Sequence, residues 1–278
     1  MIKLVAIDLD GTLLNGKKTI SPRNKAALIA AKAQGVKVVI CTGRPLRAIH
    51  PFLAELNLEE AGDYSITFNG GLVQKNDTGE MIEKNVLSFA QVEELIALAQ
   101  SLDLPIDLLS EATVYNVQTS KKHQSLYATM NPLLTHIPTE VADVQANRVY
   151  NKAVIGFEQV FLDAQIQKIP AVIREEFEVI KSREMLLEFM PKGVTKAYGL
   201  SLLVRDLGLK QVQVMSIGDE ENDLSMIEYA GIGVAMANAV PLVKAVADVV
   251  TDSNEEDGVA KVIEEYILQE GSVLSGLI

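Results

Sequence analysis

The sequence has a single cysteine, Cys41, no tryptophan, and only three histidines among its 278 residues. One cysteine cannot form a disulfide within the chain, which excludes a disulfide-stabilised secreted scaffold and is typical of a reducing compartment. The histidines, His50, His123 and His136, lie far apart and show none of the spacings of a zinc site. We therefore expect a cytoplasmic protein that uses neither disulfides nor zinc.

The sequence also lacks a long apolar run. No segment approaches the roughly 20 uninterrupted apolar residues of a membrane-spanning helix, and Asp8 and Asp10 interrupt the only early apolar run, so we expect no secretion signal. Cationic residues are the minority, because 25 lysines and arginines face 37 acidic residues and the formal net charge is −12. Since nucleic acids and anionic membranes need cationic surfaces, we expect neither as a partner. A phosphorylated ligand would need local cations or a bound metal.

Apolar residues make up 48% of the chain, enough for a sizeable core, and the length is typical of two domains. Near the N-terminus, apolar strands predicted at 3–7, 36–40 and 64–68 alternate with a helix at 21–35, whose N-cap is Ser21. Such alternation predicts right-handed crossovers and a parallel sheet. The C-terminal part repeats this alternation. Its predicted strands are 212–217, "GIGVAM" and 248–251. Its predicted helices are 195–208, 221–231, one that begins at about 241, and 258–268.

The middle of the chain has a different pattern. Consecutive strands with one polar face indicate antiparallel pairing and an α+β arrangement; they are predicted at 113–119, 148–157, 177–183 and 185–190, with helices at 88–102 and 158–169. We therefore predict an α/β fold with a doubly wound, Rossmann-like parallel-sheet core formed by residues 1–83 and 192–278, and an inserted α+β domain at 84–191. Residues 270–278 are expected to be loosely held, although their apolar side chains could dock.

The stretch "DLDGT" follows the first predicted strand. If that strand persists, Asp8 and Asp10 point to the same side. Two facing carboxylates repel unless a cation lies between them, which favours a Mg²⁺ site, and a carboxylate can also act as a nucleophile toward phosphorus. The alternative, a strand followed by an ordinary Asp-Gly turn, stays open on this stretch alone.

Three further polar stretches lie where they can reach the same sheet edge, at which ligands of open α/β sheets bind. "CTGR" offers the Thr42 hydroxyl and exposed N–H groups near Gly43, and "PKGVTK" places Lys196 at a helix start. "GDEEND" repeats the strand-end carboxylate in Asp219, followed by Asn222 and Asp223 on one helix face. Each has an ordinary alternative, namely an exposed loop, surface lysines and an acidic helix start. Together they predict a magnesium-assisted phosphoryl-transfer site.

The order and spacing of five motifs, "DLDGTLL", "TGR", "KGVTK", "GDEENDLSM" and "GIGVAMANA", resemble those of the haloacid dehalogenase superfamily. More narrowly, the sequence is similar to the Cof-type sugar-phosphate phosphatases, which carry a large α/β cap inserted after the third core strand. The resemblance covers essentially the whole chain. One departure is Ala197, where relatives often have glycine directly after the motif lysine; helix packing rather than chemistry should differ there.

The resemblance implies roles for the matching residues. Asp8 would be the nucleophile that becomes an aspartyl-phosphate, and Asp10 the general acid and base. Lys196 would neutralise the transferring phosphoryl group, with Asn222 assisting. Thr42, Gly43 and the backbone N–H of Leu9 would contact the phosphate. The implied magnesium set is Asp8, Asp10 through its carbonyl, Asp219, and Asp223, which would orient the others.

The expected function is therefore a Mg²⁺-dependent phosphatase that acts on small sugar or related metabolite phosphates. The expected partner is a small phosphorylated metabolite, and the expected state is a monomer or a homodimer. Two alternatives stay open: a phosphomutase, and a non-catalytic regulator that binds a phosphorylated ligand on the same fold. The inserted domain would act as a cap that contacts the leaving group. Its candidate polar contacts are Glu111, Tyr115, Asn116 and Lys152.

Overall fold

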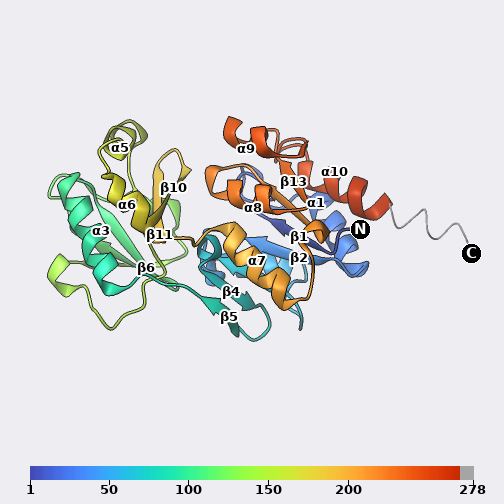
Figure 1. Ribbon diagram of the computed structural model, residues 1–278, viewed down its shortest axis with the longest axis horizontal. Coiled ribbons are helices and arrows are strands. Elements are labelled where there is room, and N and C mark those ends of the chain that lie inside the picture. The colour runs from blue at the N-terminus through green and yellow to red at the C-terminus, as the bar shows by residue number, and fades with distance from the viewer. Residues whose placement is uncertain (270–278) are drawn as a thin grey trace, which may run out of the picture. The chain divides into compact units, whose positions relative to one another are not determined.

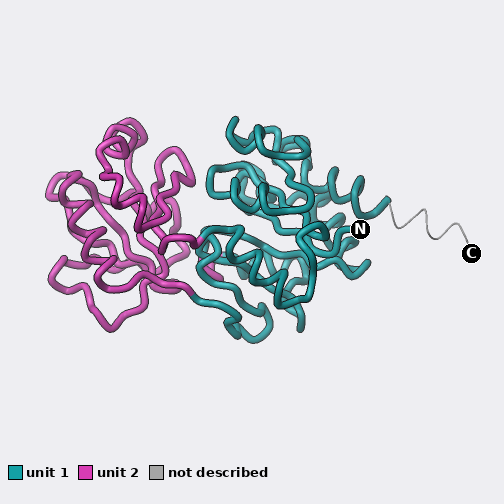
Figure 2. The backbone as a smooth tube through the Cα atoms, viewed as in Figure 1, with its two compact units in different colours: residues 1–44, 49–84, 195–278 teal, residues 45–48, 85–194 magenta. Residues whose placement is uncertain are grey.

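The computed structural model describes residues 1–269, and the expectation for residues 270–278 lies outside this range. The described chain forms two compact units, which Figure 2 distinguishes by colour. Of the described residues, the first unit comprises 1–44, 49–84 and 195–269, and the second comprises 45–48 and 85–194. The second unit is thus an insertion into the chain of the first.

The first unit is built on an eight-stranded sheet in the order β14-β13-β12-β1-β2-β3-β4-β5 (Figure 1). The pairs from β14 through to β3 are parallel, whereas β3–β4 and β4–β5 are antiparallel. The strands are β1 (Leu4–Ile7), β2 (Lys37–Cys41), β3 (Tyr64–Thr67), β4 (Leu72–Lys75), β5 (Met81–Lys84), β12 (Val214–Gly218), β13 (Ile232–Ala235) and β14 (Val249–Val250).

Helices cover both faces of this sheet, because its central strands are apolar on both sides. On one face, Leu4, Ala6 and Val39 pack with side chains of α7 and α8, which contact each other. Helix α1 contacts β2 and α10. The helices of this part of the chain are α1 (Pro22–Ala33), α2 (Leu46–Glu55), α7 (Lys196–Asp206), α8 (Leu224–Tyr229), α9 (Pro241–Val246) and α10 (Gly258–Ile263), with short helical turns η1 (Phe68–Gly70), η3 (Gln211–Gln213), η4 (Glu221–Asp223) and η5 (Glu264–Leu268).

The second unit contains a six-stranded sheet in the order β10-β11-β9-β6-β7-β8, antiparallel except for the β7–β8 pair. One face packs against its helices in an apolar core that includes Leu95, Ile155 and Phe189. Its elements are α3 (Phe89–Ser101), β6 (Ile106–Ser110), β7 (Thr113–Val117), α4 (Tyr127–Met130), β8 (Thr135–Thr139), η2 (Val141–Asp143), β9 (Lys152–Gly156), α5 (Gln159–Ile166), α6 (Ala171–Glu176), β10 (Phe177–Arg183) and β11 (Leu186–Pro191).

The predicted fold class, an α/β core with a doubly wound parallel sheet and an α+β insertion, is confirmed. Strands β4, β5, β6 and β8 and helices α4 and α6 were not predicted from the sequence. The helix predicted at 221–231 is divided into the turn η4 and the short helix α8. Within residues 1–269, no helix combines the length and the apolar character needed to cross a membrane.

Candidate active site

Three buried aspartates, Asp8, Asp219 and Asp223, form the centre of the candidate site in the first unit. Asp8 directly follows β1, and Asp219 directly follows the neighbouring parallel strand β12. Asp223 closes the turn η4 four residues after Asp219. Each aspartate offers an oxygen atom within 4.8 Å of those of the others. Adjacent strand ends therefore bring together carboxylates that are more than 200 residues apart in the sequence.

Lys196 neutralises part of this cluster. It is the first residue of α7, whose N-cap is Thr195, and its side chain is fully buried. Its Nζ atom lies 2.6 Å from Oδ1 of Asp8 and 2.6 Å from Oδ1 of Asp223. An ammonium group shared by two carboxylates in a buried place is a strong, directional interaction. The helix start thus delivers one positive charge to the aspartate that the sequence analysis predicted as nucleophile.

Asp223 has both carboxylate oxygens engaged. Its Oδ1 accepts from Lys196, while its Oδ2 accepts from the backbone N–H groups of Asp219, at 2.8 Å, and Glu220, at 3.0 Å. The Asp219 side chain accepts from the Thr12 hydroxyl at 2.7 Å. Asp223 is therefore held by hydrogen bonds on both oxygens, and Asp8 and Asp219 each have an oxygen within 4.8 Å of the other.

These residues fit a divalent cation. Hard carboxylate and carbonyl oxygens are the ligands that Mg²⁺ prefers, and the three carboxylates meet within a few ångströms. Burial raises the pKa of Asp219 to about 9, and the neighbouring Asp223 and Asp8 charges add to the effect. A cluster of this kind gains from a positive ion that offsets burial and mutual repulsion.

Burial and neighbouring charges also shift the pKa values of Asp8 and Lys196. Burial raises the pKa of Asp8 to about 7, against the opposing effect of Lys196, and Asp223 and Asp10 add further repulsion. Burial alone would lower the pKa of Lys196, but the Asp223 and Asp8 carboxylates raise it above its usual range. Lys196 is therefore a permanent cation beside Asp8.

Gly11 allows Asp219 to approach the first turn. Its φ of +81° is in the left-handed region, and a Cβ atom built on it would lie 2.2 Å from Oδ2 of Asp219. A side chain at this position would be strained and would also collide with the carboxylate. The "DLDGT" turn thus needs glycine for backbone conformation and for space. Asn238 adds a hydrogen bond of 2.8 Å to the Gly11 carbonyl oxygen.

Asp10 lies differently from the expectation. Strand β1 ends at Ile7, so the side-by-side orientation expected from a continuing strand does not apply to Asp8 and Asp10. The Asp10 carboxylate instead binds Arg44 through two hydrogen bonds, Nε–Oδ2 at 2.8 Å and Nη2–Oδ1 at 2.7 Å. Lys18 adds a contact of 2.8 Å to Oδ1. A turn, rather than strand alternation, separates the two aspartates.

The remaining predicted phosphate contacts lie in the same unit. Thr42 directly follows β2, is buried, and its Oγ1 accepts from the backbone N–H of Arg44 at 3.2 Å. Leu9 is fully buried in the first turn. The Asn222 side chain donates from Nδ2 to Oδ1 of Asn69 at 3.1 Å.

Four residues around the site were not predicted: Thr12, Lys18, Arg44 and Asn69. Arg44 stands in the "TGR" stretch, where an exposed loop arginine was the ordinary expectation, and its side chain is in fact only 16% exposed. Thr12 belongs to the predicted "DLDGT" motif, so a role for its hydroxyl could have been predicted from the sequence. Asn69 follows β3, the one central strand end at which the sequence analysis sought no functional group.

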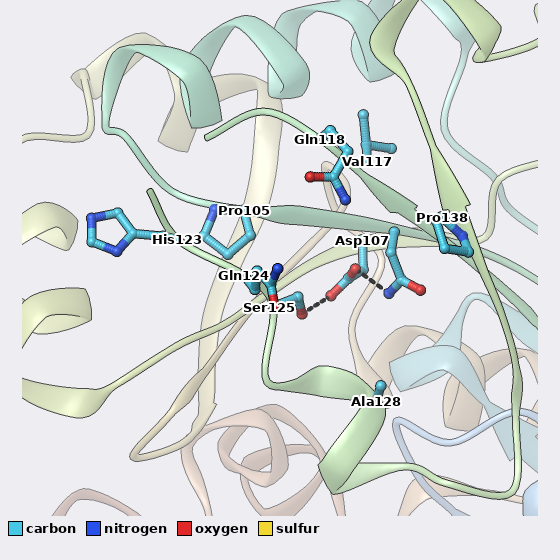
Figure 3. A pocket seen from close by; sticks show the side chains of 10 residues that line it. Pro105, Asp107, Val117, Gln118, His123, Gln124, Ser125, Ala128 and Pro138 are labelled. Carbon is cyan, nitrogen blue, oxygen red and sulfur yellow. Dashed lines mark hydrogen bonds between the residues drawn. The ribbon is translucent and has the colours of Figure 1, made fainter. Parts of the chain in front are cut away.

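The second unit has a cavity of its own, of about 250 Å³, lined by both polar and apolar residues. Figure 3 shows the buried Asp107 carboxylate at this cavity, with the Ser125 hydroxyl donating to it. Asn116, a candidate leaving-group contact, donates to Asp107 at 2.6 Å. Burial raises the pKa of Asp107 to about 6, while the two hydrogen bonds oppose the shift. The cavity is lined by Pro105, Asp107, Asn116, Val117, Gln118, His123, Gln124, Ser125, Ala128 and Pro138.

The other three candidate leaving-group contacts are distributed over this unit. Lys152 forms a buried ion pair with Glu188. The ring of Tyr115 lies 4.0 Å below the Arg148 guanidinium. Glu111 has a left-handed backbone and donates its N–H to Asn151.

The sequence matches the family of haloacid dehalogenase-like hydrolases over residues 5–263. The chain belongs to this family. It is 38% identical to YxeH of Bacillus subtilis (strain 168), named provisionally as a phosphatase, with 96% of this chain and 99% of that one covered. It is 33% identical to YcsE of the same strain, named a 5-amino-6-(5-phospho-D-ribitylamino)uracil phosphatase, with 96% of each covered. It is also similar to the solved structure of the HAD subclass IIB sugar phosphatase BT4131, with 28% identity, a TM-score of 0.79, and 95% and 98% of the two chains covered.

The predicted family is confirmed, and with it the prediction that this chain is a hydrolytic enzyme. The buried aspartates that meet at the sheet edge are compatible with a metal site of this family. The individual roles predicted for the site residues remain predictions.

Proposed function

We propose that this chain is a Mg²⁺-dependent phosphatase that hydrolyses small sugar and related metabolite phosphates through a phosphorylated Asp8. The observation that carries the proposal is the position of Lys196, whose buried ammonium lies 2.6 Å from both Asp8 and Asp223, beside Asp219. A nucleophilic carboxylate, a fixed cation and a metal-ligating carboxylate in one buried cluster supply the parts that phosphoryl transfer requires.

In the first step, an oxygen of the Asp8 carboxylate attacks phosphorus, and the bond from phosphorus to the ester oxygen breaks. Lys196 offsets the negative charge of the phosphoryl oxygens, assisted by the Thr42 hydroxyl and the Asn222 amide. Asp10 gives a proton to the departing alcohol. Because Lys196 already lies beside Asp8, little reorganisation of this charge is needed when negative charge develops.

In the second step, water attacks the phosphorus of the aspartyl-phosphate and Asp10 accepts its proton. Phosphate leaves and the Asp8 carboxylate is restored, so the products are alcohol and inorganic phosphate. Arg44 and Lys18 hold Asp10 in a fixed position. A positioned carboxylate that changes protonation in opposite senses in the two steps is the usual design of acid and base catalysis.

The metal site of the proposal consists of Asp8, the Asp10 carbonyl and Asp219, with Asp223 orienting the set through Lys196 and the Asp219 backbone. A bound Mg²⁺ would stabilise negative charge on the transferring group. The chain's net charge of −12 makes such local compensation necessary, because an anionic substrate would otherwise be repelled.

The names of two similar proteins support the proposed substrate class. One similar protein is named a sugar phosphatase, and another is named a phosphatase for a ribitylamino-uracil phosphate. Both names describe phosphate on a sugar or sugar-derived chain, which supports the same class for this enzyme. The inserted unit would then act as the cap that contacts the leaving group.

The test is a screen for phosphate release with Mg²⁺ over sugar phosphates, including glucose 1-phosphate and erythrose 4-phosphate, and 5-amino-6-(5-phospho-D-ribitylamino)uracil. We expect release from at least one sugar-type substrate, and a loss of at least about 10³-fold in Asp8→Asn. Isomerised sugar phosphate without released phosphate would identify a mutase instead. Binding of these compounds without any turnover would identify a regulator.

A further inference from the structure

A strained turn follows β3 and lies beside the proposed phosphate contacts. Phe68, Asn69 and Gly70 all have positive φ values, of 52°, 54° and 96°. Two of the three are not glycine, and Phe68 is a bulky residue for which a left-handed backbone is unusual. Phe68 and Asn69 are nevertheless almost completely buried. Buried strain of this kind persists only where surrounding structure enforces it.

Backbone hydrogen bonds tie this turn to the "TGR" loop. Asn69 donates its N–H to the Thr42 carbonyl at 3.0 Å, and Thr42 donates its own to the Ile66 carbonyl at 2.9 Å. Phe68 donates to the Arg44 carbonyl at 3.4 Å. These hydrogen bonds therefore fix the backbone of Asn69 relative to the residues that follow β2.

The turn also packs on the start of α7. A Cβ atom on Gly70 would lie 1.9 Å from the carbonyl oxygen of Thr195, the residue that precedes Lys196. Only glycine permits both this contact and the φ of 96°. The turn therefore contacts both the "TGR" loop, which is proposed to bind phosphate, and the start of α7, where Lys196 lies.

The Asn69 side chain connects two predicted phosphate contacts. Its Oδ1 accepts from Nδ2 of Asn222 at 3.1 Å. The same oxygen would lie 2.9 Å from a Cβ atom on Gly43, so the amide passes directly over that glycine. The Asn222 amide nitrogen has two hydrogens. One points to Asn69, and this fixes the direction of the other.

We propose that Asn69 is a positioning residue that orients the Asn222 amide toward the phosphoryl group and fixes its place relative to Thr42 and Gly43. The inference rests on the proposed phosphatase function. In this role Asn69 acts through Asn222, whose side-chain amide it binds. The left-handed backbone is the means by which the chain turns a short amide side chain from β3 toward that residue.

The test combines Asn69→Gly, Asn69→Ala and Asn222→Ala with the double variant Asn69→Gly/Asn222→Ala. Glycine tolerates the left-handed backbone and removes the amide, whereas alanine removes the amide and keeps the strain. Asn57→Gly is the matched control, because Asn57 also has a positive φ, of 56°, but is exposed at the end of α2. Each variant is measured for kcat, KM and melting temperature on the best substrate of the screen, and for binding of inorganic phosphate by calorimetry.

Asn69→Gly and Asn69→Ala should each lower kcat/KM by about tenfold, the size of one oriented hydrogen bond, and weaken phosphate binding. Asn222→Ala should cost about tenfold in the native background but less than about threefold once Asn69 is glycine, because the two residues act as a unit. Asn57→Gly should leave kcat/KM unchanged.

The inference would be overturned by additive losses from Asn69→Gly and Asn222→Ala, or by an Asn69→Gly enzyme as active as Asn57→Gly. If alanine inactivated the enzyme and glycine did not, backbone strain rather than the amide would be responsible, which also contradicts it. Absence of hydrolysis by the native enzyme would defeat the proposed function alone, since phosphate binding by the same variants still reports on Asn69.

Discussion

The Arg44 guanidinium holds the Asp10 carboxylate through two parallel hydrogen bonds, of 2.8 Å from Nε and 2.7 Å from Nη2. Arg44 comes directly after Thr42 and Gly43, so the loop proposed to bind phosphate also carries the residue that positions the proposed acid and base. A bidentate pair fixes both the place and the plane of a carboxylate. A displacement of the "TGR" loop would therefore also displace the Asp10 carboxylate.

Arg44→Lys tests this coupling, because lysine keeps the charge but cannot form the two-pronged contact. We expect kcat to fall by about tenfold or more, corresponding to a loss of at least about 1.4 kcal/mol of transition-state stabilisation. Steady-state kinetics on the best substrate measure it. Arg23→Lys is the control, since Arg23 forms a comparable ion pair with Glu264 on the exposed surface. Equal kinetics for both variants would show that the bidentate contact is irrelevant to catalysis.

Lys196→Met tests the charge balance of the buried cluster. The change leaves buried carboxylates without their cation, and breaking such a pair costs about 3–5 kcal/mol of unfolding free energy. The cost should be largest near pH 8 and shrink below pH 6, because protonated carboxylates no longer need a counter-charge. Urea unfolding at several pH values measures it. Lys261→Met, which removes an exposed pair with Asp252, should change stability by less than about 1 kcal/mol. A Lys196→Met deficit that grew on acidification would contradict this assignment.

Asp219→Asn tests the metal site, because its effect on thermal stability should differ between solutions without and with Mg²⁺. Without Mg²⁺, the variant should melt at a higher temperature than the native protein at pH 7.5, because it removes a buried acid whose charged form is disfavoured. With millimolar Mg²⁺, the native protein should gain stability and the variant should gain little, since only ligands of the folded state stabilise it. Differential scanning calorimetry with and without Mg²⁺ measures both effects. An equal Mg²⁺ shift in both proteins would place the metal elsewhere.

Asp107 should make the second unit sensitive to pH. Its pKa is raised to about 6 by burial, above its ordinary value of 3.8, so the folded state binds the proton more tightly than the unfolded state. The free energy of unfolding should therefore fall as the pH rises from about 4 to about 6, by up to about 3 kcal/mol, and then stay level. Hydrogen exchange of β6 and β7 amides across this range measures it.

Asp107→Asn removes the titrating group and should flatten that profile. Asp163→Asn, which alters a half-exposed ion pair in the same unit, should leave the slope unchanged. A native profile that rises between pH 4 and 6, or a slope that survives in Asp107→Asn, would contradict the assignment.

Three of the predicted site residues share one property, because each is a polar residue directly after a buried apolar strand. Asp8, Thr42 and Asp219 all satisfy it, and a parallel sheet gathers such positions at one edge. Asn69 does not stand out in this way, because its role depends on a left-handed backbone and on contacts with residues distant in sequence. Arg44 was visible, but only the fold reveals that Asp10 is its partner.

Two of the unpredicted strands, β6 and β8, also lack a clear local signal. Strand β8 contains Pro138 and is largely exposed at a sheet edge, so it lacks the apolar alternation that predicts a strand. Strand β6 is buried, but Asp107 interrupts its apolar run in the sequence. In the fold, Ser125 and Asn116 donate hydrogen bonds to the Asp107 carboxylate. Such compensation comes from tertiary contacts and leaves little trace in the local sequence.

The most direct test of the central claim is to trap the phosphorylated enzyme. With a phosphate ester whose leaving group needs no protonation, Asp10→Asn should still form the aspartyl-phosphate but hydrolyse it slowly, because the water lacks its base. After acid quenching, peptide mass spectrometry should then find one phosphoryl group on Asp8 in Asp10→Asn and none in Asp8→Asn. A phosphoryl group on another residue, or native turnover by Asp8→Asn, would contradict the account.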